Sequence, residues 1–434
     1  MKPKADLYIY GASEVITCVP SASDRLGRIP DGEIAIAEGR IVALGQRSSV
    51  EKVVDLSPAK KMDIGGRMIV PGFVDCHTHL VFGRSRVMEY ALKMTKSVAE
   101  IEAMGLKTGI PASIQMTREE SEDALFEGAL DRLNRMMGYG TTTVESKSGY
   151  GIRLADELKQ LRVNRRLGQA QPVVVVSTFL GAHDFPPEID RQDPVARQAY
   201  VRELIEEMIP RVAADGLAEF CDIYCDTGYY TAEESEMILR AGMAHGLRPR
   251  IHTDAYANVG GSSLAAGLAA ISADHLNYTS SQEMHRLAEA GVVGVVLPAL
   301  DFAVAHPDPF DARAMINAGM TLALGTNLNP GNWTESMQVV MQLACRNHGM
   351  SPEEAMLAAT VGAAKAVCRQ DRIGCLAEGY QADLQVWDLP TFEDVIYRIG
   401  HNAVSMVLKR GKVVVEQAAM APRPLHQGRP RLLK

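Results

Sequence analysis

The chain has 434 residues, of which 47% are hydrophobic and 23% charged, and its formal net charge is −8. This composition is ordinary for a globular protein, and the acidic balance argues against nucleic acid or an anionic membrane as a partner. The length suits a large α/β barrel with a smaller module. No apolar run is long enough to cross a bilayer, and the basic tail at 423–434 is expected to be a solvated end.

Seven cysteines are scattered along the chain, without the compact spacing of a disulfide framework. This usage predicts reduced thiols and a cytoplasmic protein. Cys221 and Cys225 are four residues apart but have no matching second pair, so a structural zinc site is not expected there.

Both ends of the chain have β character. Short apolar or alternating runs, punctuated by glycine, predict strands at 7–10, 33–36, 40–44 and 382–388, with a hairpin turn at 409–412. Because two β-rich ends flank a long α/β middle, residues 1–70 and 371–434 are predicted to form one small β-sandwich domain.

The middle, residues 71–370, alternates apolar runs with amphipathic helical patterns such as 121–137, 194–214 and 231–244. The predicted strands are 69–76, 141–145, 173–180, 220–224, 249–252, 270–275, 294–297 and 321–325. Alternating β and α elements in this number predict a (β/α)8 TIM-like barrel rather than a doubly wound sheet.

Histidines follow several of these strands. His77 and His79 come after the apolar run 68–74, and on a strand their side chains would point to the same side. His252 and His275 close two later strands, at the end of a barrel where enzymes keep their chemistry. A single such histidine is more often a hydrogen-bonded core residue, but three with an open position suit a metal that activates water.

Six longer motifs carry a family resemblance. They are PGFVDCHTHLVFGRSR (71–86), YGTTTVESKSGYGI (139–152), TFLGAHDFPPE (178–188), RIHTDAYANVGG (250–261), SADHLNYTS (272–280) and ALGTNLNPG (323–331). With these motifs the chain resembles the amidohydrolase superfamily and, within it, the imidazolonepropionases. The resemblance covers nearly the whole chain.

The resemblance implies a set of site residues. One divalent metal ion, Zn²⁺ or alternatively Fe²⁺, would be bound by His77, His79, His252 and Asn327. His275 would hold or polarise the water and move its proton. The substrate would be gripped by Arg86, Tyr150 and His183. A homodimer is the expected assembly.

The chain departs from the family pattern at three positions. Asn327 stands where the family has an aspartate; its carbonyl oxygen can bind a metal, but it cannot accept a proton. Ala255 stands where the family has Glu or Gln, and Ala99 falls at an aromatic position near the substrate. The candidates for a replacement proton acceptor are His275, Asp254, His183 and Asp301. We favour His275, because an imidazole close to a metal-bound water is expected to titrate in a useful range.

Three functions are therefore considered. The first is a metal-dependent hydrolase that opens a small nitrogen heterocycle at a C–N bond, as imidazolonepropionases do. The second is a deaminase-type hydrolase that displaces an exocyclic group from a related ring. The third is an inactive, ligand-binding homologue.

Overall fold

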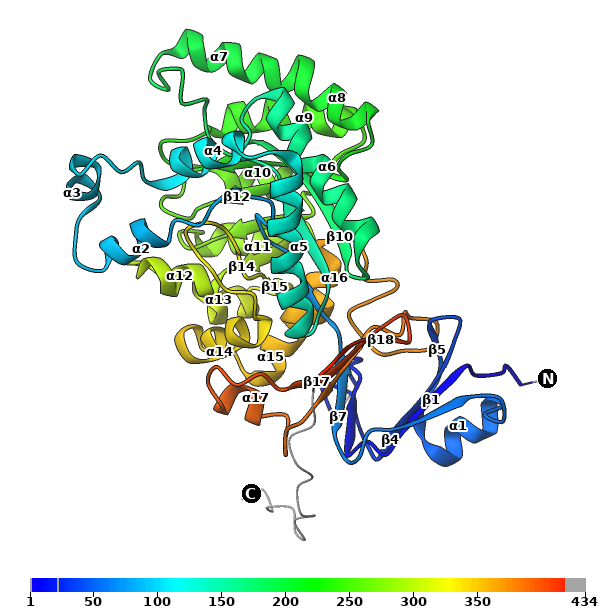
Figure 1. The fold of residues 1–434 in the computed structure, drawn as a ribbon. Coiled ribbons are helices and arrows are strands. Elements are labelled where there is room, and N and C mark those ends of the chain that lie inside the picture. Colours follow the sequence, from blue (N-terminus) through cyan, green and yellow to red (C-terminus); the bar gives the residue numbers. More distant parts are fainter. Residues whose placement is uncertain (1, 22, 418–434) are drawn as a thin grey trace.

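The computed structural model describes residues 2–21 and 23–417. The helix-covered barrel and the β-rich module lie beside each other, and both ends of the chain contribute to the module (Figure 1). The basic tail at 423–434, and the part of the predicted sandwich domain beyond residue 417, lie outside the described residues. Within the described ranges, no helix has the length and apolar character that a membrane span needs.

Eight strands form one sheet in chain order, each paired in parallel with the next. They are β8 (Phe73–Asp75), β9 (Thr141–Lys147), β10 (Val174–Ala182), β11 (Phe220–Cys225), β12 (Arg248–Thr253), β13 (Ser272–His275), β14 (Val293–Val296) and β15 (Leu322–Leu324). Sequential parallel neighbours require a crossover between every pair of strands, and helices supply them. The predicted (β/α)8 barrel is confirmed.

Helices cover the outside of the barrel. They are α5 (Glu122–Gly138), α6 (Leu154–Ala170), α7 (Pro194–Glu203), α8 (Ile209–Ala214), α9 (Ala232–Ala244), α10 (Gly261–Gly267), α11 (Ser281–Glu289), α12 (Pro298–Val304), α13 (Ala312–Asn317), α14 (Met337–His348), α15 (Pro352–Leu357) and α16 (Ala363–Ala366). Capping side chains fix where several of these helices begin. Thr231 and Glu234, for example, form a reciprocal capping box at the start of α9. The helical pattern at 194–214 contains one π-helical turn, η1 (Leu204–Met208), and a second, η2 (Ala358–Gly362), separates α15 from α16.

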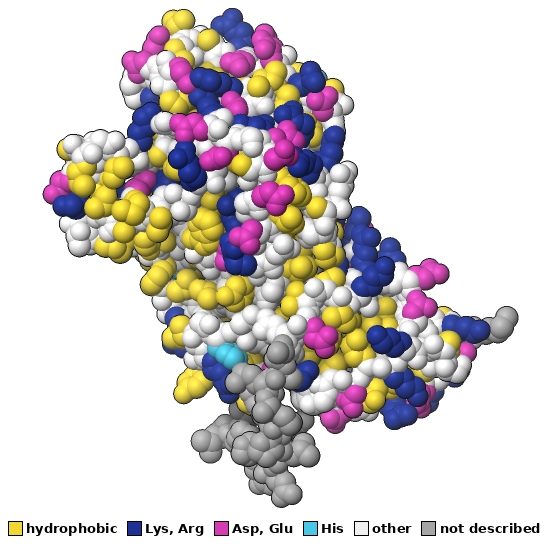
Figure 2. Space-filling model, viewed as in Figure 1, with side chains coloured by type: hydrophobic (Ala, Val, Ile, Leu, Met, Phe, Trp, Pro, Cys, Tyr) yellow, Lys and Arg dark blue, Asp and Glu magenta, His cyan; other side chains and the backbone are white. Residues whose placement is uncertain are grey.

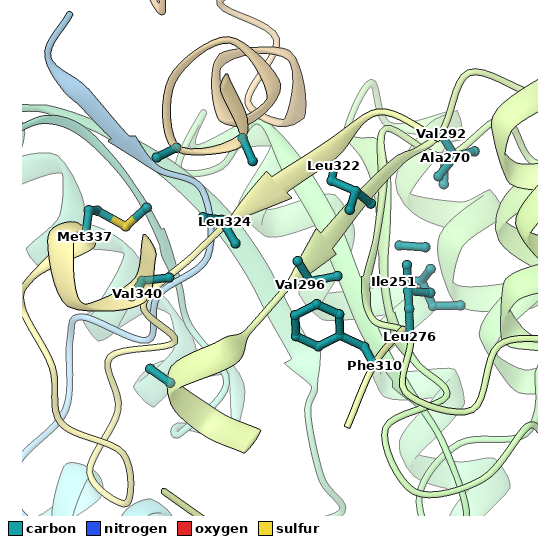
Figure 3. Close-up of a cluster of buried hydrophobic side chains, with 14 of the residues drawn as sticks. Ile251, Ala270, Leu276, Val292, Val296, Phe310, Leu322, Leu324, Met337 and Val340 are labelled. Carbon is teal, nitrogen blue, oxygen red and sulfur yellow. The ribbon is translucent and has the colours of Figure 1, made fainter. Parts of the chain in front are cut away.

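The main hydrophobic core lies between the strands and these helices. In Figure 3, Phe310 packs against Val296 of β14, close to Leu322 of β15, while Met337 and Val340 of α14 cover the next stretch. Burying such side chains contributes roughly 1.5–3 kcal/mol each, which stabilises the barrel without involving its mouth.

The β-rich module consists of two sheets that share a core. One sheet has the order β5-β4-β1-β6 and the other β18-β17-β16-β7-β2-β3. The strands are β1 (Leu7–Tyr10), β2 (Glu14–Ile16), β3 (Arg28–Pro30), β4 (Gly32–Ala37), β5 (Arg40–Gln46), β6 (Lys60–Asp63), β7 (Met68–Pro71), β16 (Leu384–Trp387), β17 (Val404–Lys409) and β18 (Lys412–Glu416); short helices α1 (Arg47–Val53) and α17 (Asp394–Tyr397) flank them. Ile9, Ile36, Ile69 and Val386 meet in the shared core. The predicted hairpin at 409–412 joins β17 to β18.

One strand prediction is wrong in detail. The run 69–76 is two strands: β7 pairs with β16 and β2 in the module, and only β8 pairs with β9 in the barrel. The break falls at Gly72, where an added Cβ would lie 2.4 Å from the Thr142 hydroxyl. His77 and His79 consequently follow the barrel strand in irregular backbone instead of lying on it.

In the connection from β8 to β9, three helices precede α5: α2 (Val87–Lys93), α3 (Val98–Ala103) and α4 (Gly109–Glu119). The first two form an arm that projects from the barrel, and Figure 2 shows apolar side chains gathered on it. Val87 and Met88 are 63% and 67% exposed. Ala99 is also exposed, on α3 in this arm.

Candidate metal centre and substrate pocket

The structure brings the sequence-predicted histidines together at the mouth of the barrel. The ring of His77 lies 4.6 Å from that of His252, 5.6 Å from that of His79 and 5.7 Å from that of His275, measured between centroids. All four side chains are buried. Residues at the C-terminal ends of β8, β12 and β13 thus form one cluster, although almost 200 residues separate His77 from His275 along the chain.

The irregular backbone after β8 is held in place by the segment after β15. The Asn327 amide donates to the His77 carbonyl at 3.0 Å, and the His79 amide donates to the Leu328 carbonyl at 2.9 Å. A Cβ on Gly325 would lie 2.7 Å from the His77 Cβ, so only glycine allows this approach. These contacts close the barrel between its first and last strands and fix the positions of the two ligand segments.

Two buried carboxylates orient the imidazoles. Asp274 lies 2.6 Å from Nδ1 of His77, and Asp222 lies 3.1 Å from Nδ1 of His252. An ionised carboxylate only accepts hydrogen bonds, so each Nδ1 carries the proton and each Nε2 keeps its lone pair. This is the arrangement that prepares histidine to bind a metal.

A buried charge network surrounds these carboxylates. Lys147 donates to Glu145 at 3.0 Å and to Asp222 at 2.8 Å, and Arg250 donates to Asp274 at 3.1 Å. Burial and Arg250 act to lower the pKa of Lys147, but the carboxylates outweigh them and the pKa is raised. Burial acts to raise the pKa of Asp274, yet Arg250 and Lys147 lower it. The two carboxylates that orient the histidines therefore stay ionised.

The unsatisfied polar atoms fit a divalent metal ion. His77 and His252 each leave Nε2 buried without a hydrogen-bond partner among the described residues, and Asn327 leaves Oδ1 in the same state. Ligand atoms of His77, His79 and His252 lie within 4.8 Å of one another. Atoms that share one ion at about 2.1 Å are at most about 4.2 Å apart, so small side-chain adjustments would seat the metal.

A second group with metal-like spacing does not fit an ion. Atoms of Asp222, His252 and Asp274 also lie within 4.8 Å of one another. The ammonium of Lys147, however, already stands 2.8 Å from Asp222 and 3.7 Å from Asp274. This group is a paired charge network, and the single-ion site is the one around His77.

Asn327 is preorganised as a metal ligand. Its backbone is left-handed, with φ of 49°, a conformation that asparagine tolerates better than most residues. Asn329 and Asn332 donate side-chain hydrogen bonds to the Asn327 carbonyl at 2.8 and 3.1 Å. The backbone is thereby fixed, while the side-chain oxygen remains free of protein partners among the described residues.

His275 lies at the cluster. Burial lowers the pKa of His275 to about 3, so the imidazole is neutral at pH 7. The other carboxylate candidates are engaged elsewhere. Asp254 accepts hydrogen bonds from Thr253, Ser262 and Thr279, and Asp301 accepts two from Asn277. Both carboxylates tie loops together at the rim.

Three further sequence-predicted residues lie beside the histidines. His183 stacks on His79 with centroids 4.7 Å apart, and the ring of Tyr150 lies 5.3 Å from His183 and 5.5 Å from His79. Burial lowers the pKa of His183 to about 3. Burial raises the pKa of Tyr150, and the positive charge of nearby Arg86 partly opposes this. The Nε of Arg86 is buried without a hydrogen bond among the described residues and stands 3.6 Å from the Glu89 carboxylate, as an ion pair.

The loop that carries Tyr150 is held by hydrogen bonds to α6. Glu157 of α6 accepts the amides of Gly149, Gly151 and Ile152 at 2.8–3.2 Å. Gln160, one turn later, accepts the Tyr150 amide at 3.0 Å. The first turns of α6 therefore position the tyrosine.

Sequence reasoning missed the buried charges that support the site: Lys147, Asp222, Arg250 and Asp274. A signal was present, because each is a charged residue inside a barrel strand, and fully buried charges occur almost only in pairs. The pairing itself joins different strands, so the pattern along one strand could not assign it.

A (β/α)8 barrel with a buried histidine cluster and an oriented, unsatisfied ligand set defines a metal-dependent hydrolase. Comparisons with known proteins agree. Residues 68–414 match the sequence profile of the amidohydrolase family. The chain is 42% identical to an imidazolonepropionase of Geobacillus kaustophilus over 94% of this chain and 98% of that protein, and 41% identical to one of Symbiobacterium thermophilum over 98% and 100%.

Solved structures share the fold at lower identity. An adenosine deaminase from Xanthomonas campestris with bound zinc has a TM-score of 0.69 at 20% identity, covering 96% of this chain and 94% of that one. Atrazine chlorohydrolase from Arthrobacter aurescens has a TM-score of 0.66 at 19% identity, covering 97% of each chain. The chain belongs to the amidohydrolase family, as its motifs indicated. It is an enzyme that hydrolyses non-peptide C–N bonds.

Proposed function

We propose that this enzyme opens the ring of imidazolonepropionate, or of a close relative, by hydrolysing a C–N bond of the ring. The observation that carries the proposal is the buried cluster of His77, His79 and His252, with unpaired ligand nitrogens, in a chain 42% identical to an imidazolonepropionase. Ring opening consumes one water and breaks one C–N bond, which the cluster is suited to catalyse.

Different residues would bind the metal, orient its ligands and take up the proton. His77, His79, His252 and Asn327 would hold a divalent ion, which when bound activates water and polarises a carbonyl. Asp222 and Asp274 keep the two imidazoles in the ligand tautomer. Neutral His275, with its ring centroid 5.2 Å from that of His252, would orient the attacking water and receive its proton.

The substrate would lie between this cluster and the side chains of Tyr150, His183 and Arg86. Arg86 offers a planar fork of donors that suits the carboxylate of a propionate group. Its Nε stands 3.6 Å from the Glu89 carboxylate without a hydrogen bond, so Glu89 holds the guanidinium beside the cluster and the fork keeps donors for an anionic ligand. Tyr150 and His183 supply flat surfaces against which a planar ring can stack.

The finer properties are proposals as well. Zinc is the proposed metal and iron(II) the alternative, since both accept three histidines with an open position. The homodimer remains a proposal from the family resemblance, which the solution mass would test. All seven cysteines are free, which supports a reducing compartment such as the cytoplasm.

The direct test is turnover. We expect the protein loaded with zinc or iron to remove the chromophore of imidazolonepropionate, followed by ultraviolet absorbance, without an equivalent release of ammonia. Loss of ammonia with the ring intact would instead support exocyclic displacement.

The His77→Ala variant is expected to lose at least a thousandfold in kcat/KM, because one metal ligand is removed. His285→Ala is the matched control, since His285 is exposed on α11 and is not part of the cluster. Activity that survives His77→Ala would contradict the proposal, and so would a metal-loaded wild-type protein with no turnover.

A further inference from the structure

Tyr224 is a pocket residue that none of the family motifs above contains. It lies on β11 two residues after Asp222, so both side chains point to the same side of the strand, into the barrel. Its ring centroid lies 5.9 Å from that of His252, 6.1 Å from that of His183 and 6.3 Å from that of His275. The tyrosine ring therefore lies close both to the proposed metal ligand His252 and to the proposed substrate-binding residue His183.

The hydroxyl of Tyr224 makes no hydrogen bond to the described residues, although the side chain is only 6% exposed. Two other buried tyrosines show the usual outcome: Tyr200 donates to the Gly181 carbonyl at 2.9 Å and Tyr230 to the Asp184 carbonyl at 3.0 Å. A buried tyrosine normally finds such a partner. Without one, Tyr224 has a donor available for a ligand in the pocket.

The strand that carries Tyr224 is also connected to the turn that contains Ala255. Asp226 accepts the amides of Ala255, Tyr256 and Ala257 at 2.7–3.2 Å, which joins the segment after β11 to the turn after β12. Burial raises the pKa of Tyr224, and Tyr229, Asp226 and Tyr256 raise it further, so its hydroxyl is protonated at neutral pH. Ala255 itself offers only a methyl group there.

We propose that Tyr224 determines substrate specificity: its hydroxyl donates a hydrogen bond to a carbonyl oxygen or ring nitrogen of the bound heterocycle, at the side of the pocket where Ala255 provides no polar atom. The inference rests on the proposed function for the identity of the ring. It concerns binding and orientation of that ring, and involves no bond making or proton transfer by Tyr224.

The test removes only the hydroxyl. Tyr224→Phe is expected to lower kcat/KM for imidazolonepropionate by about 10- to 100-fold, as one unmatched hydrogen bond would. KM should rise more than kcat falls, because the bond is present in the ground state. Metal content and thermal midpoint should match the wild type. Tyr229→Phe is the control: its ring lies 4.1 Å from that of Tyr224, and Asp184 and Arg191 act on its hydroxyl more strongly than Tyr256 and Asp226 do.

Binding of hydantoin, a planar cyclic ureide, separates this inference from the proposed function. By calorimetry we expect the zinc-loaded wild type to bind hydantoin at least tenfold more tightly than Tyr224→Phe. If this difference appears without turnover of imidazolonepropionate, the proposed function fails and the inference stands. Equal kcat/KM or equal hydantoin affinity in Tyr224→Phe overturns the inference. A wild type that neither turns over imidazolonepropionate nor binds hydantoin overturns both.

Discussion

Asn327 is the residue at which this chain differs most consequentially from its family's pattern. Its side-chain oxygen is positioned like a ligand, yet it carries no charge and cannot accept a proton. We expect Asn327→Asp to bind the metal on the order of tenfold more tightly, because an anionic ligand gains at least about 1.4 kcal/mol over a neutral one beside a dication. Competition with a chromogenic chelator measures this affinity directly.

Asn327→Ala provides the matched opposite, since it removes the carboxamide with its oxygen and leaves only a methyl group. It should bind the metal more weakly than the wild type. Metal affinity should therefore fall in the order Asn327→Asp, wild type, Asn327→Ala. Equal affinities across the series would mean that Asn327 is not a ligand. Because the readout is affinity, the result does not depend on knowing the substrate.

At the residue scale, the sequence predicted a site residue where a residue type that can bind metal stood at the end of a predicted barrel strand. His252 and His275 could be predicted because each histidine ends an apolar or small-residue strand, which in a barrel fixes its location. The pKa of His275 could not, because it depends on burial by distant elements and falls to about 3. Tyr224 gave no signal, since an aromatic residue in a buried strand is ordinary in a core.

At the scale of elements, the first two turns of α6 do the positioning that the Gly149–Tyr150–Gly151 loop cannot do alone. We expect Glu157→Gln to raise KM several-fold, because an amide NH₂ would face backbone amides that now donate to a carboxylate. Metal content should stay unchanged, since no metal candidate contacts Glu157. Steady-state kinetics and metal analysis on the same preparation give both quantities.

The control for this change is Glu127→Gln, on the exposed face of α5, where the same chemical substitution meets solvent. It should leave KM and susceptibility to limited proteolysis as in the wild type. Faster cleavage near residue 150 in Glu157→Gln alone would tie the kinetic change to loosening of the loop. An unaltered KM in Glu157→Gln would contradict the positioning role.

Element boundaries show why the run at 69–76 was mistaken for one barrel strand. Its side chains are buried throughout, and burial is what an apolar run reports. Which sheet buries them is decided by partners far along the chain, β16 for the first half and β9 for the second. Pro71 and Gly72 mark the division, but a proline–glycine pair alone does not distinguish a turn from a change of sheet.

At the scale of the whole molecule, long-range contacts join the two ends of the chain in the module, and other long-range contacts join the first and last strands of the barrel. The module's six-stranded sheet takes β2, β3 and β7 from the first part of the chain and β16, β17 and β18 from the last. The division of the chain at residues 70 and 371 stays a prediction. The barrel sheet closes at its mouth where Asp75 accepts from the Thr326 hydroxyl at 2.6 Å. Sequence pattern predicted both arrangements as a class, but not these contacts.

A metal at this mouth would tie together segments after β8 and β15 and the end of β12, so its removal should destabilise the whole barrel. With free metal at about 1,000 times Kd, binding contributes about 4 kcal/mol, and we expect chelation to lower the thermal midpoint by on the order of 5–10 °C. Differential scanning calorimetry of wild type and His77→Ala, each with and without dipicolinate, measures the effect. His77→Ala should respond little, because it binds metal weakly before chelation. A midpoint that is unchanged in wild type after complete metal loss would show that the imidazole cluster is held by the protein alone, and that the ion has no structural role.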